Sequence, residues 1–229
     1  MYLDLYLAAT YIALDFLLSL QASAMWYDVF STFYDTTLER LYHKPREEAI
    51  SVLNPKPGSV VLDIACGTGQ NFPFLEERIG DGIIVGVDQS KGMLNQAEKR
   101  CTKAGWNNVK LVCSDIHDFD RESLKNHSGK QQADFVICAL GLSVINDWTA
   151  VFQKSFDLLK QGGRFAIFDA HAEKRILQTW TTEWLSGADL SRKVWEPLEK
   201  ETVVFEKHIL PGSPRIFGGH LFVAVGEKP

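Results

Sequence analysis

The sequence predicts an α/β fold, with a doubly wound, mostly parallel sheet of seven strands behind a helical N-terminal segment. Two observations predict it. From residue 60 onward, short apolar runs alternate with helical patterns, which is typical of parallel strands joined by crossover helices. The chain also has 229 residues, of which 45% are hydrophobic. That size and composition suit one α/β domain with a lid or an insertion.

The apolar runs give the expected positions of the elements. Five strands are expected at about 60–65, 83–87, 109–113, 134–139 and 163–169, with helices at about 70–79, 91–104, 118–127 and 149–160. Two more strands, at 202–209 and 219–225, are expected around a turn at 211–214. The polar run 125–132 is expected to be a surface loop, and the tryptophan-rich residues 171–200 are expected to be helical.

Residues 1–50 are expected to be helical. Pro45, followed by Glu47 and Glu48, is typical of a first helical turn, so one helix is expected to start at about Lys44. Earlier in the chain, residues 1–20 are strongly apolar.

The apolar residues 1–20 carry only two charges, Asp4 and Asp15. No basic residue precedes them, so a signal peptide is not expected. Two acids would also be costly inside a bilayer. The segment is expected to pack as a helix on the domain or on a second subunit, with a lid or a membrane-surface contact as alternatives.

A glycine turn follows the first strand, as Gly67-Thr68-Gly69. Glycine lets the backbone turn sharply and approach a ligand closely. Asp88 ends the next apolar run about 20 residues on, where a ribose-binding carboxylate is expected. A dinucleotide fingerprint needs a third glycine, but Phe72 stands there, and the chain has no phosphate-binding Gly-Lys-Ser/Thr. The pattern therefore indicates an adenosine ligand without a pyrophosphate.

Five segments in order resemble the motifs of class I S-adenosylmethionine-dependent methyltransferases. They are residues 60–69, 85–94, 113–116, 134–140 and 158–165. The resemblance covers roughly residues 45–226. It implies the strand order 3-2-1-4-5-7-6, S-adenosyl-L-methionine as cofactor and S-adenosyl-L-homocysteine as product. The ligand would then lie at the carboxyl ends of the first two strands.

The same resemblance implies where the cofactor is bound. The implied cofactor-binding residues are Asp63, Ala65, Cys66, Gly67, Gly69, Asp88, Gln89, Met93, Ser114, Asp115, Ile116 and Ala139. Asp88 would accept hydrogen bonds from both ribose hydroxyls, and Asp115 from the adenine amino group. The alternatives are a helix cap for Asp88 and plain core packing for Met93.

Methyl transfer from a sulfonium requires alignment and exclusion of water, so no metal is expected. Tyr27 and Tyr34 resemble the N-terminal segment of ubiquinone and menaquinone C-methyltransferases, where such a tyrosine covers the cofactor. Aromatic packing is the alternative for both. Ser143 and Asn146, after the fourth strand, are expected to bind the acceptor. His171 is the candidate general base, with a structural role as its alternative.

The domain organisation follows from these assignments. Residues 1–45 are expected to form a helical lid, residues 46–229 a Rossmann-like cofactor-binding domain, and residues 171–200 a helical cover over the acceptor site. A net charge of −5 argues against a nucleic-acid partner. The four cysteines show no metal-ligand spacing and are interpreted as reduced thiols of a cytoplasmic protein: Cys66, Cys101, Cys113 and Cys138.

The expected function is S-adenosylmethionine-dependent methylation of a small, partly apolar acceptor. N-methylation is slightly favoured, because no base dyad is evident. A lipid headgroup amine is one candidate, since residues 187–195 resemble bacterial phospholipid N-methyltransferases. The alternatives are C-methylation of a quinone precursor and, from another class, a non-catalytic cofactor-binding partner protein. Peripheral membrane contact through residues 1–20 and a homodimer both stay open.

Overall fold

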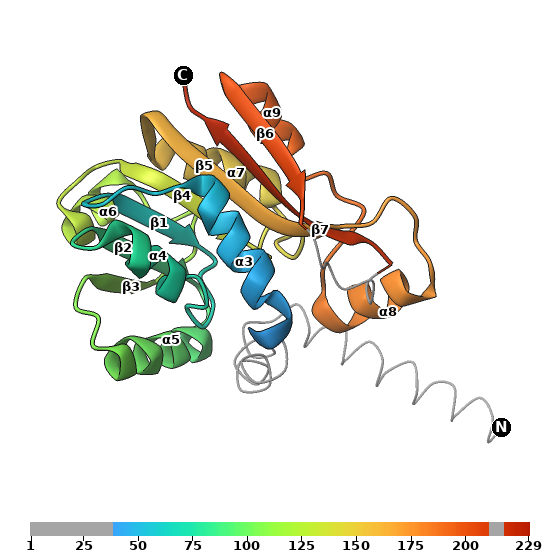
Figure 1. Cartoon of the computed structure of the whole chain (residues 1–229), viewed down its shortest axis with the longest axis horizontal. Coiled ribbons are helices and arrows are strands. Elements are labelled where there is room, and N and C mark those ends of the chain that lie inside the picture. Colours follow the sequence, from blue (N-terminus) through green and yellow to red (C-terminus); the bar gives the residue numbers. More distant parts are fainter. Residues whose placement is uncertain (1–38, 211–217) are drawn as a thin grey trace.

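A computed structural model describes residues 39–210 and 218–229 (Figure 1). Seven strands form one sheet in the order β3-β2-β1-β4-β5-β7-β6, which confirms the predicted order. The strands are β1 (Val60–Ile64), β2 (Ile83–Asp88), β3 (Val109–Cys113), β4 (Ala133–Ala139), β5 (Leu159–His171), β6 (Val204–Ile209) and β7 (His220–Glu227). The first five are parallel, and β7 runs antiparallel to both β5 and β6.

Helices cover both faces of the sheet (Figure 1). On one face lie α3 (Glu39–Leu53), α4 (Phe72–Ile79) and α5 (Lys91–Ala104), and on the other α6 (Arg121–Ser128), α7 (Trp148–Leu158) and α9 (Glu196–Glu201). The remaining helix, α8 (Leu177–Ser186), follows β5. Every residue of the central strand β1 is buried as a result. That two-sided burial explains why its sequence is a continuous apolar run rather than an alternating one.

Local signals fix where the helices start and stop. The Ser90 hydroxyl accepts from the Met93 amide at the start of α5, and Gly105 ends that helix in a left-handed conformation. Asp120 caps α6 in the same way by accepting from the Ser123 amide. The first cap starts α5 just after the carboxyl end of β2, and the second starts α6 a short loop after the carboxyl end of β3.

The predicted start of the first described helix is wrong. We expected it at Lys44, but α3 begins at Glu39 and includes Pro45 within its length. Proline removes one helical hydrogen bond, which a helix packed on a sheet tolerates more easily than an isolated one. Buried residues such as Ala49 and Ile50 provide that packing.

The surface loop predicted at 125–132 is also partly wrong, because its first residues belong to α6. The Ser128 hydroxyl donates to the Leu124 carbonyl and accepts from the Lys130 amide, which closes the helix end. The polar composition reflects an exposed last turn rather than a loop.

Two further boundaries differ from the prediction. β5 begins at Leu159 rather than at 163, because Leu159 pairs with Ala133 ahead of a register shift in β4. Residues 171–200 are only partly helical, since an irregular stretch at 187–195 separates α8 from α9. That stretch makes backbone hydrogen bonds to other loops, for example from the Asp189 amide to the Ser143 carbonyl.

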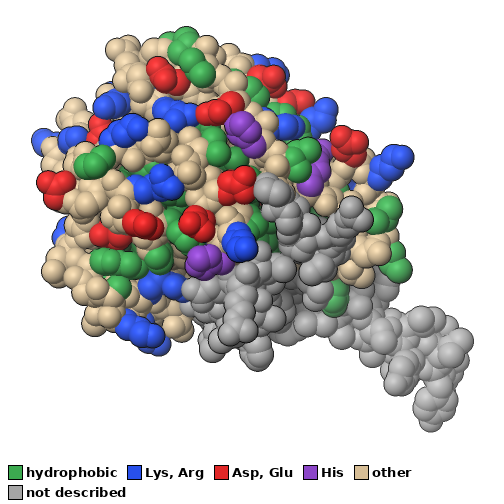
Figure 2. All heavy atoms as spheres, in the orientation of Figure 1, with side chains coloured by type: hydrophobic (Ala, Val, Ile, Leu, Met, Phe, Trp, Pro, Cys, Tyr) green, Lys and Arg blue, Asp and Glu red, His purple; other side chains and the backbone are tan. Residues whose placement is uncertain are grey.

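The N-terminal predictions, with Tyr27 and Tyr34, concern residues 1–38 and lie outside the described residues. Within the described ranges, no helix has both the length and the apolar character to cross a membrane. On the face shown in Figure 2, basic and acidic side chains are interspersed rather than segregated.

Candidate active site

The carboxyl ends of β1, β2, β4 and β5 lie along one edge of the sheet, where open α/β sheets bind ligands. Two residues directly after strands have positive φ angles without being glycine: Ala65 at 52° after β1, and Leu140 at 58° after β4. Such conformations cost about 1–2 kcal/mol per residue and concentrate at functional sites. Because β1 and β4 are neighbours, both strained turns point to the same place.

The glycine turn after β1 packs closely against the Phe72 ring at Gly69 and is open at Gly67. A Cβ on Gly69 would lie 2.5 Å from the Phe72 ring, and one on Gly86 would lie 2.9 Å from it. A Cβ on Gly67 would meet no atom of the described residues within 4 Å. Phe72, in the place of a third fingerprint glycine, is thus accommodated by a glycine on β2. The free side of Gly67 leaves room for a ligand.

Asp88 lies half-buried at the end of β2 and holds the glycine turn. Its Oδ2 accepts from the Gly67 amide at 2.9 Å, and its Oδ1 accepts from the Ser90 amide at 2.8 Å. The carboxylate of Asp88 therefore lies directly beside the glycine turn, where a ribose-binding acid is expected.

The residues expected around the adenine lie on the adjoining ends of β2 and β3. Asp115 is exposed, and its Oδ1 accepts from the His117 amide at 2.9 Å. The Ser114 amide donates to the Asp88 carbonyl, which ties the two strand ends together. Gln89 is exposed, whereas Met93 and Ile116 are buried. Their contact with adenine stays a prediction.

A buried polar cluster beneath the glycine turn was not expected from the sequence. The Asn71 amide nitrogen donates to both oxygens of Asp63 at 2.9 Å. Arg46, on α3, donates to the Asn71 side-chain oxygen at 2.5 Å and to the Gln70 side-chain oxygen at 3.2 Å. All four residues are buried. Burial raises the pKa of Asp63 from its ordinary 3.8 to about 7, although Asn71 and Arg46 oppose the shift.

In this structure Asp63 is buried and bonds Asn71, so it holds the glycine turn in place. Asn71 lies inside the glycine motif and could have been suspected from its position. Arg46 lies 25 residues earlier, and nothing in the local sequence signals its contact. The last two predicted members, Cys66 and Ala139, are buried and half-buried beside the two strained turns.

On the acceptor side, Ser143 is held by a buried carboxylate. Its amide donates to Asp169 Oδ2 at 3.0 Å, and its hydroxyl donates to Asp169 Oδ1 at 2.7 Å. Burial raises the pKa of Asp169 to about 6, against the hydrogen bonds from Ser143 and Ala170. The Ser143 hydroxyl is therefore committed to positioning its own loop. Asn146, in contrast, is exposed. Acceptor binding by either residue stays a prediction.

His171 ends β5 and is buried beside the Trp195 ring, whose centroid lies 4.8 Å away. Its Nδ1 lies 3.2 Å from the Arg192 carbonyl oxygen. Because a carbonyl can only accept, Nδ1 carries a hydrogen, and in the neutral ring Nε2 is then the nitrogen without one. Burial lowers the pKa of His171 below its ordinary 6.5, and the Lys207 charge acts in the same direction. The ring is neutral at pH 7.

The thiols and charged groups add no metal site in the part of the chain that the structure describes. No group of three or more His, Cys, Asp and Glu side chains there could hold a metal ion. Cys66, Cys101, Cys113 and Cys138 are all free. Burial raises the pKa of the Cys66 and Cys138 thiols, so neither is activated as a nucleophile.

Comparison with known proteins agrees with this geometry. Residues 61–163 match a family model described as "Methyltransferase domain". Demethylmenaquinone methyltransferase from Listeria monocytogenes is 28% identical over 131 residues, which are 57% of this chain and 52% of the relative. The chain thus matches about half the length of that curated relative.

Solved structures show the same fold at low sequence identity. A putative methyltransferase, solved in complex with the Haloferax volcanii Trm112 methyltransferase activator, superposes with a TM-score of 0.69 at 17% identity, covering 89% of this chain and 97% of that one. Phospholethanolamine N-methyltransferase 2 from Haemonchus contortus gives 0.62 at 17% identity, covering 87% and 60%. That structure holds phosphomonomethylethanolamine and S-adenosylhomocysteine.

The sheet order, the glycine turn and the family match define a methyltransferase domain of the class I, S-adenosylmethionine-dependent type. The residues of this chain fit the cofactor: Gly67 has an open side, and the Asp88 carboxylate lies next to it at the end of β2.

We expect the free energy of unfolding to depend on pH because of the raised pKa of Asp63. Between about pH 4 and pH 7 the folded chain keeps a proton on Asp63 that the unfolded chain releases, so stability falls as the pH rises through this window. Asp63→Asn removes the titration. Urea unfolding should therefore show the wild-type advantage over Asp63→Asn shrinking from pH 4 to 7 and levelling above. An advantage that grows with pH would mean an ionised Asp63 held by Arg46.

Asp88→Ala should weaken S-adenosylmethionine binding by about 2–3 kcal/mol, because it removes a charged acceptor for two hydroxyls and for the Gly67 amide. Isothermal titration calorimetry measures this directly. Asp118→Ala, which removes an exposed acid from the neighbouring β3–α6 connection, is the matched control and should bind normally. Unchanged affinity in Asp88→Ala would remove Asp88 from the site.

Proposed function

We propose that this protein transfers a methyl group from S-adenosylmethionine to a small, partly apolar acceptor. The observation that carries the proposal is the half-buried Asp88 carboxylate beside the open face of Gly67. The cofactor supplies an activated methyl group when bound. The residues of the chain then have to bind it, orient the acceptor and exclude water. The buried glycine-turn cluster supports the first task, and the loop after β4 supports the second.

For the accepting atom, we favour an amine. An amine needs only to be neutral at the moment of attack, whereas a carbon or phenol acceptor needs a base or a polarising group. The described residues beside the strained turns provide no paired acid and base for such an acceptor. The fold neighbour from Haemonchus contortus is an N-methyltransferase of a phosphorylated amine. A lipid headgroup amine is one form such an acceptor could take.

C-methylation of a quinone precursor is the second candidate, and two observations favour it. The Listeria relative is a demethylmenaquinone methyltransferase. His171 also presents a neutral ring whose Nε2 can accept a proton. His171 lies three residues past Phe168, the partner of the last β4 residue, Ala139, so its backbone is about 10 Å beyond the end of that strand. A sizeable acceptor would have to fill that distance.

The proposal also assigns roles to the N-terminal segment and to the segment after β5. Residues 1–45 would form a lid, and residues 171–200 a cover over the acceptor. Within the cover, Trp180 and Trp184 are 68% and 47% exposed, whereas Trp195 is buried. Apolar residues 1–20 would contact the cover, a second subunit or the surface of a membrane. We place the protein in the cytoplasm, with peripheral membrane contact as the alternative.

A transfer assay with methyl-labelled S-adenosylmethionine tests the function. A lipid extract and an aqueous metabolite extract are offered separately, and the products are identified by mass. Label in a lipid, in steps of one methyl group, would support headgroup N-methylation. Label in a quinone would support the second candidate. A protein that binds S-adenosylmethionine but labels nothing would be a non-catalytic binding partner.

The pH profile of His171→Gln separates the two candidates. If His171 is the base, kcat/KM should fall as the pH drops below its lowered pKa, because protonation removes the acceptor on Nε2. The Gln variant should lose that acid limb and about 10²–10⁴-fold in rate. For an amine acceptor, the variant should keep the wild-type profile. His208→Gln, an exposed histidine on β6, is the control.

A further inference from the structure

The irregular stretch at 187–195, within the proposed cover, is fastened to the β4–α7 loop (residues 140–147) by one side chain. Arg192 Nη1 donates to the Ile145 carbonyl at 2.6 Å and to the Leu142 carbonyl at 3.2 Å. A guanidinium suits this work because it presents several donors in a rigid plane. Only a fifth of the Arg192 side chain is exposed, so these bonds are largely shielded from water.

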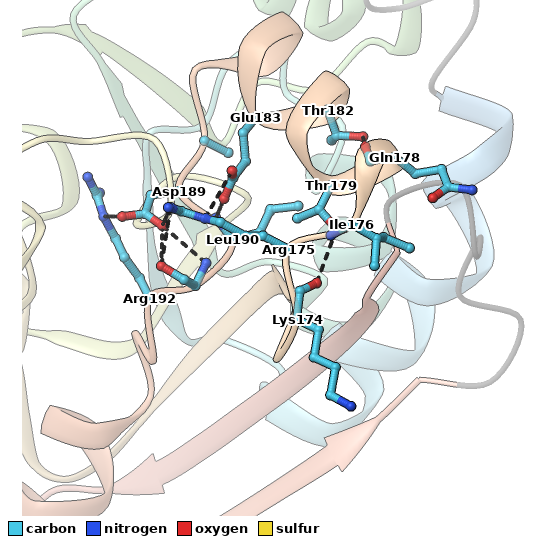
Figure 3. A network of polar contacts seen from close by, with 12 residues as sticks. Lys174, Arg175, Ile176, Gln178, Thr179, Thr182, Glu183, Asp189, Leu190 and Arg192 are labelled. Atoms are coloured by element: carbon cyan, nitrogen blue, oxygen red, sulfur yellow. Dashed lines mark hydrogen bonds and ion pairs between the residues drawn. The ribbon is translucent and has the colours of Figure 1, made fainter.

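Asp189 strengthens the same connection. Its amide donates to the Ser143 carbonyl at 2.8 Å. Its carboxylate lies between two cations, 3.4 Å from Arg192 Nε and 3.1 Å from Arg175 Nη2 (Figure 3). Although burial opposes it, hydrogen bonds from Ser191 and the two arginine charges lower the pKa of Asp189. The ion pairs are therefore present throughout the physiological range.

The connection continues to α8. Arg175 also pairs with Glu183 at 3.3 Å, and Glu183 Oε1 accepts from the Leu190 amide at 3.0 Å (Figure 3). Arg175 thus shares Asp189 with Arg192 but is half exposed, and among the described residues its hydrogen bonds go to Asp189 and Ser191 rather than to carbonyls of the β4–α7 loop. The two arginines form a matched pair for an experiment.

The loop that Arg192 holds is the one that starts at the strained Leu140 and carries Ser143 and Asn146. Asp169 fixes the same loop from the end of β5 through Ser143. The Arg192 carbonyl in turn accepts from His171 Nδ1. These contacts lie around the end of β5, three strand positions and about 14 Å from β2, which carries Asp88.

We propose that Arg192 is a positioning residue for the methyl acceptor: it sets the shape of the β4–α7 loop and binds it to the cover, while leaving the cofactor half of the site alone. The inference rests on the proposed function, because an acceptor side exists only if a methyl group is transferred. The experiment therefore has one readout that does not depend on turnover.

That readout is hydrogen exchange of the full-length protein. In Arg192→Ala, amides of the β4–α7 loop, such as those of Val144 and Ile145, should exchange at least about tenfold faster, because local opening becomes easier. Arg175→Ala should leave them within about twofold of wild type. Calorimetry should give both variants a wild-type affinity for S-adenosylmethionine. Unchanged exchange in Arg192→Ala, equal loosening in Arg175→Ala, or a loss of cofactor affinity would overturn the inference.

Turnover with the acceptor found by the labelling assay is the second readout. Arg192→Ala should raise the acceptor KM and lower kcat, with a combined loss of about 10–100-fold, as expected for a misplaced acceptor. Arg192→Lys can still reach one carbonyl and should recover part of it. An Arg192→Ala enzyme with wild-type kinetics would overturn the inference. A wild-type protein that labels nothing would overturn the proposed function, whereas the anchoring of the loop would still be judged by exchange.

Discussion

The buried Asp63 carboxyl is the constraint on which the site depends. It lies one residue before the end of the apolar strand β1, in a place that water does not reach, so its oxygens need partners from the protein. Asn71 provides them from the end of the glycine turn, and Arg46 completes the cluster from α3. The turn, the start of α4 and the middle of α3 are thereby fixed relative to one strand end. Asp88 then fixes the turn from the neighbouring strand through the Gly67 amide.

The two halves of the site are built on different parts of the fold. The cofactor half is built on the sheet itself, by short connections from β1 and β2 into α4 and α5. The acceptor half is built from segments far apart in the sequence, joined by polar contacts among Asp169, Ser143, Asp189 and Arg192. Loops vary more between related proteins than the elements they connect, so polar contacts between loops can be exchanged more easily than a sheet edge. That arrangement suits a family in which the cofactor is shared and the acceptor varies.

This contrast also explains what the sequence could predict. Strand positions, and the place of Asp88 at the end of β2, follow from apolar runs and a glycine turn, which are local signals, whereas the strand order was implied by the resemblance to class I methyltransferases. The start of α3 was mispredicted because packing on the sheet outweighed the preference of Pro45 for a first turn. The Arg46 and Arg192 contacts could not be predicted, since each depends on segments brought together by the fold. The bond from the Ser143 hydroxyl to Asp169 could not be predicted either, because the spacing along the chain does not reveal that partner.

The cluster under the glycine turn has a consequence for how this chain can evolve. Losing Asn71 alone would leave the Asp63 carboxyl without its two bonds, and losing Arg46 alone would remove the donor that orients the Asn71 amide toward Asp63. Intermediates with one member changed are therefore poorer than either end point. The three positions should vary together among descendants of this sequence, although they lie on two separate segments and none of them needs to touch the substrate.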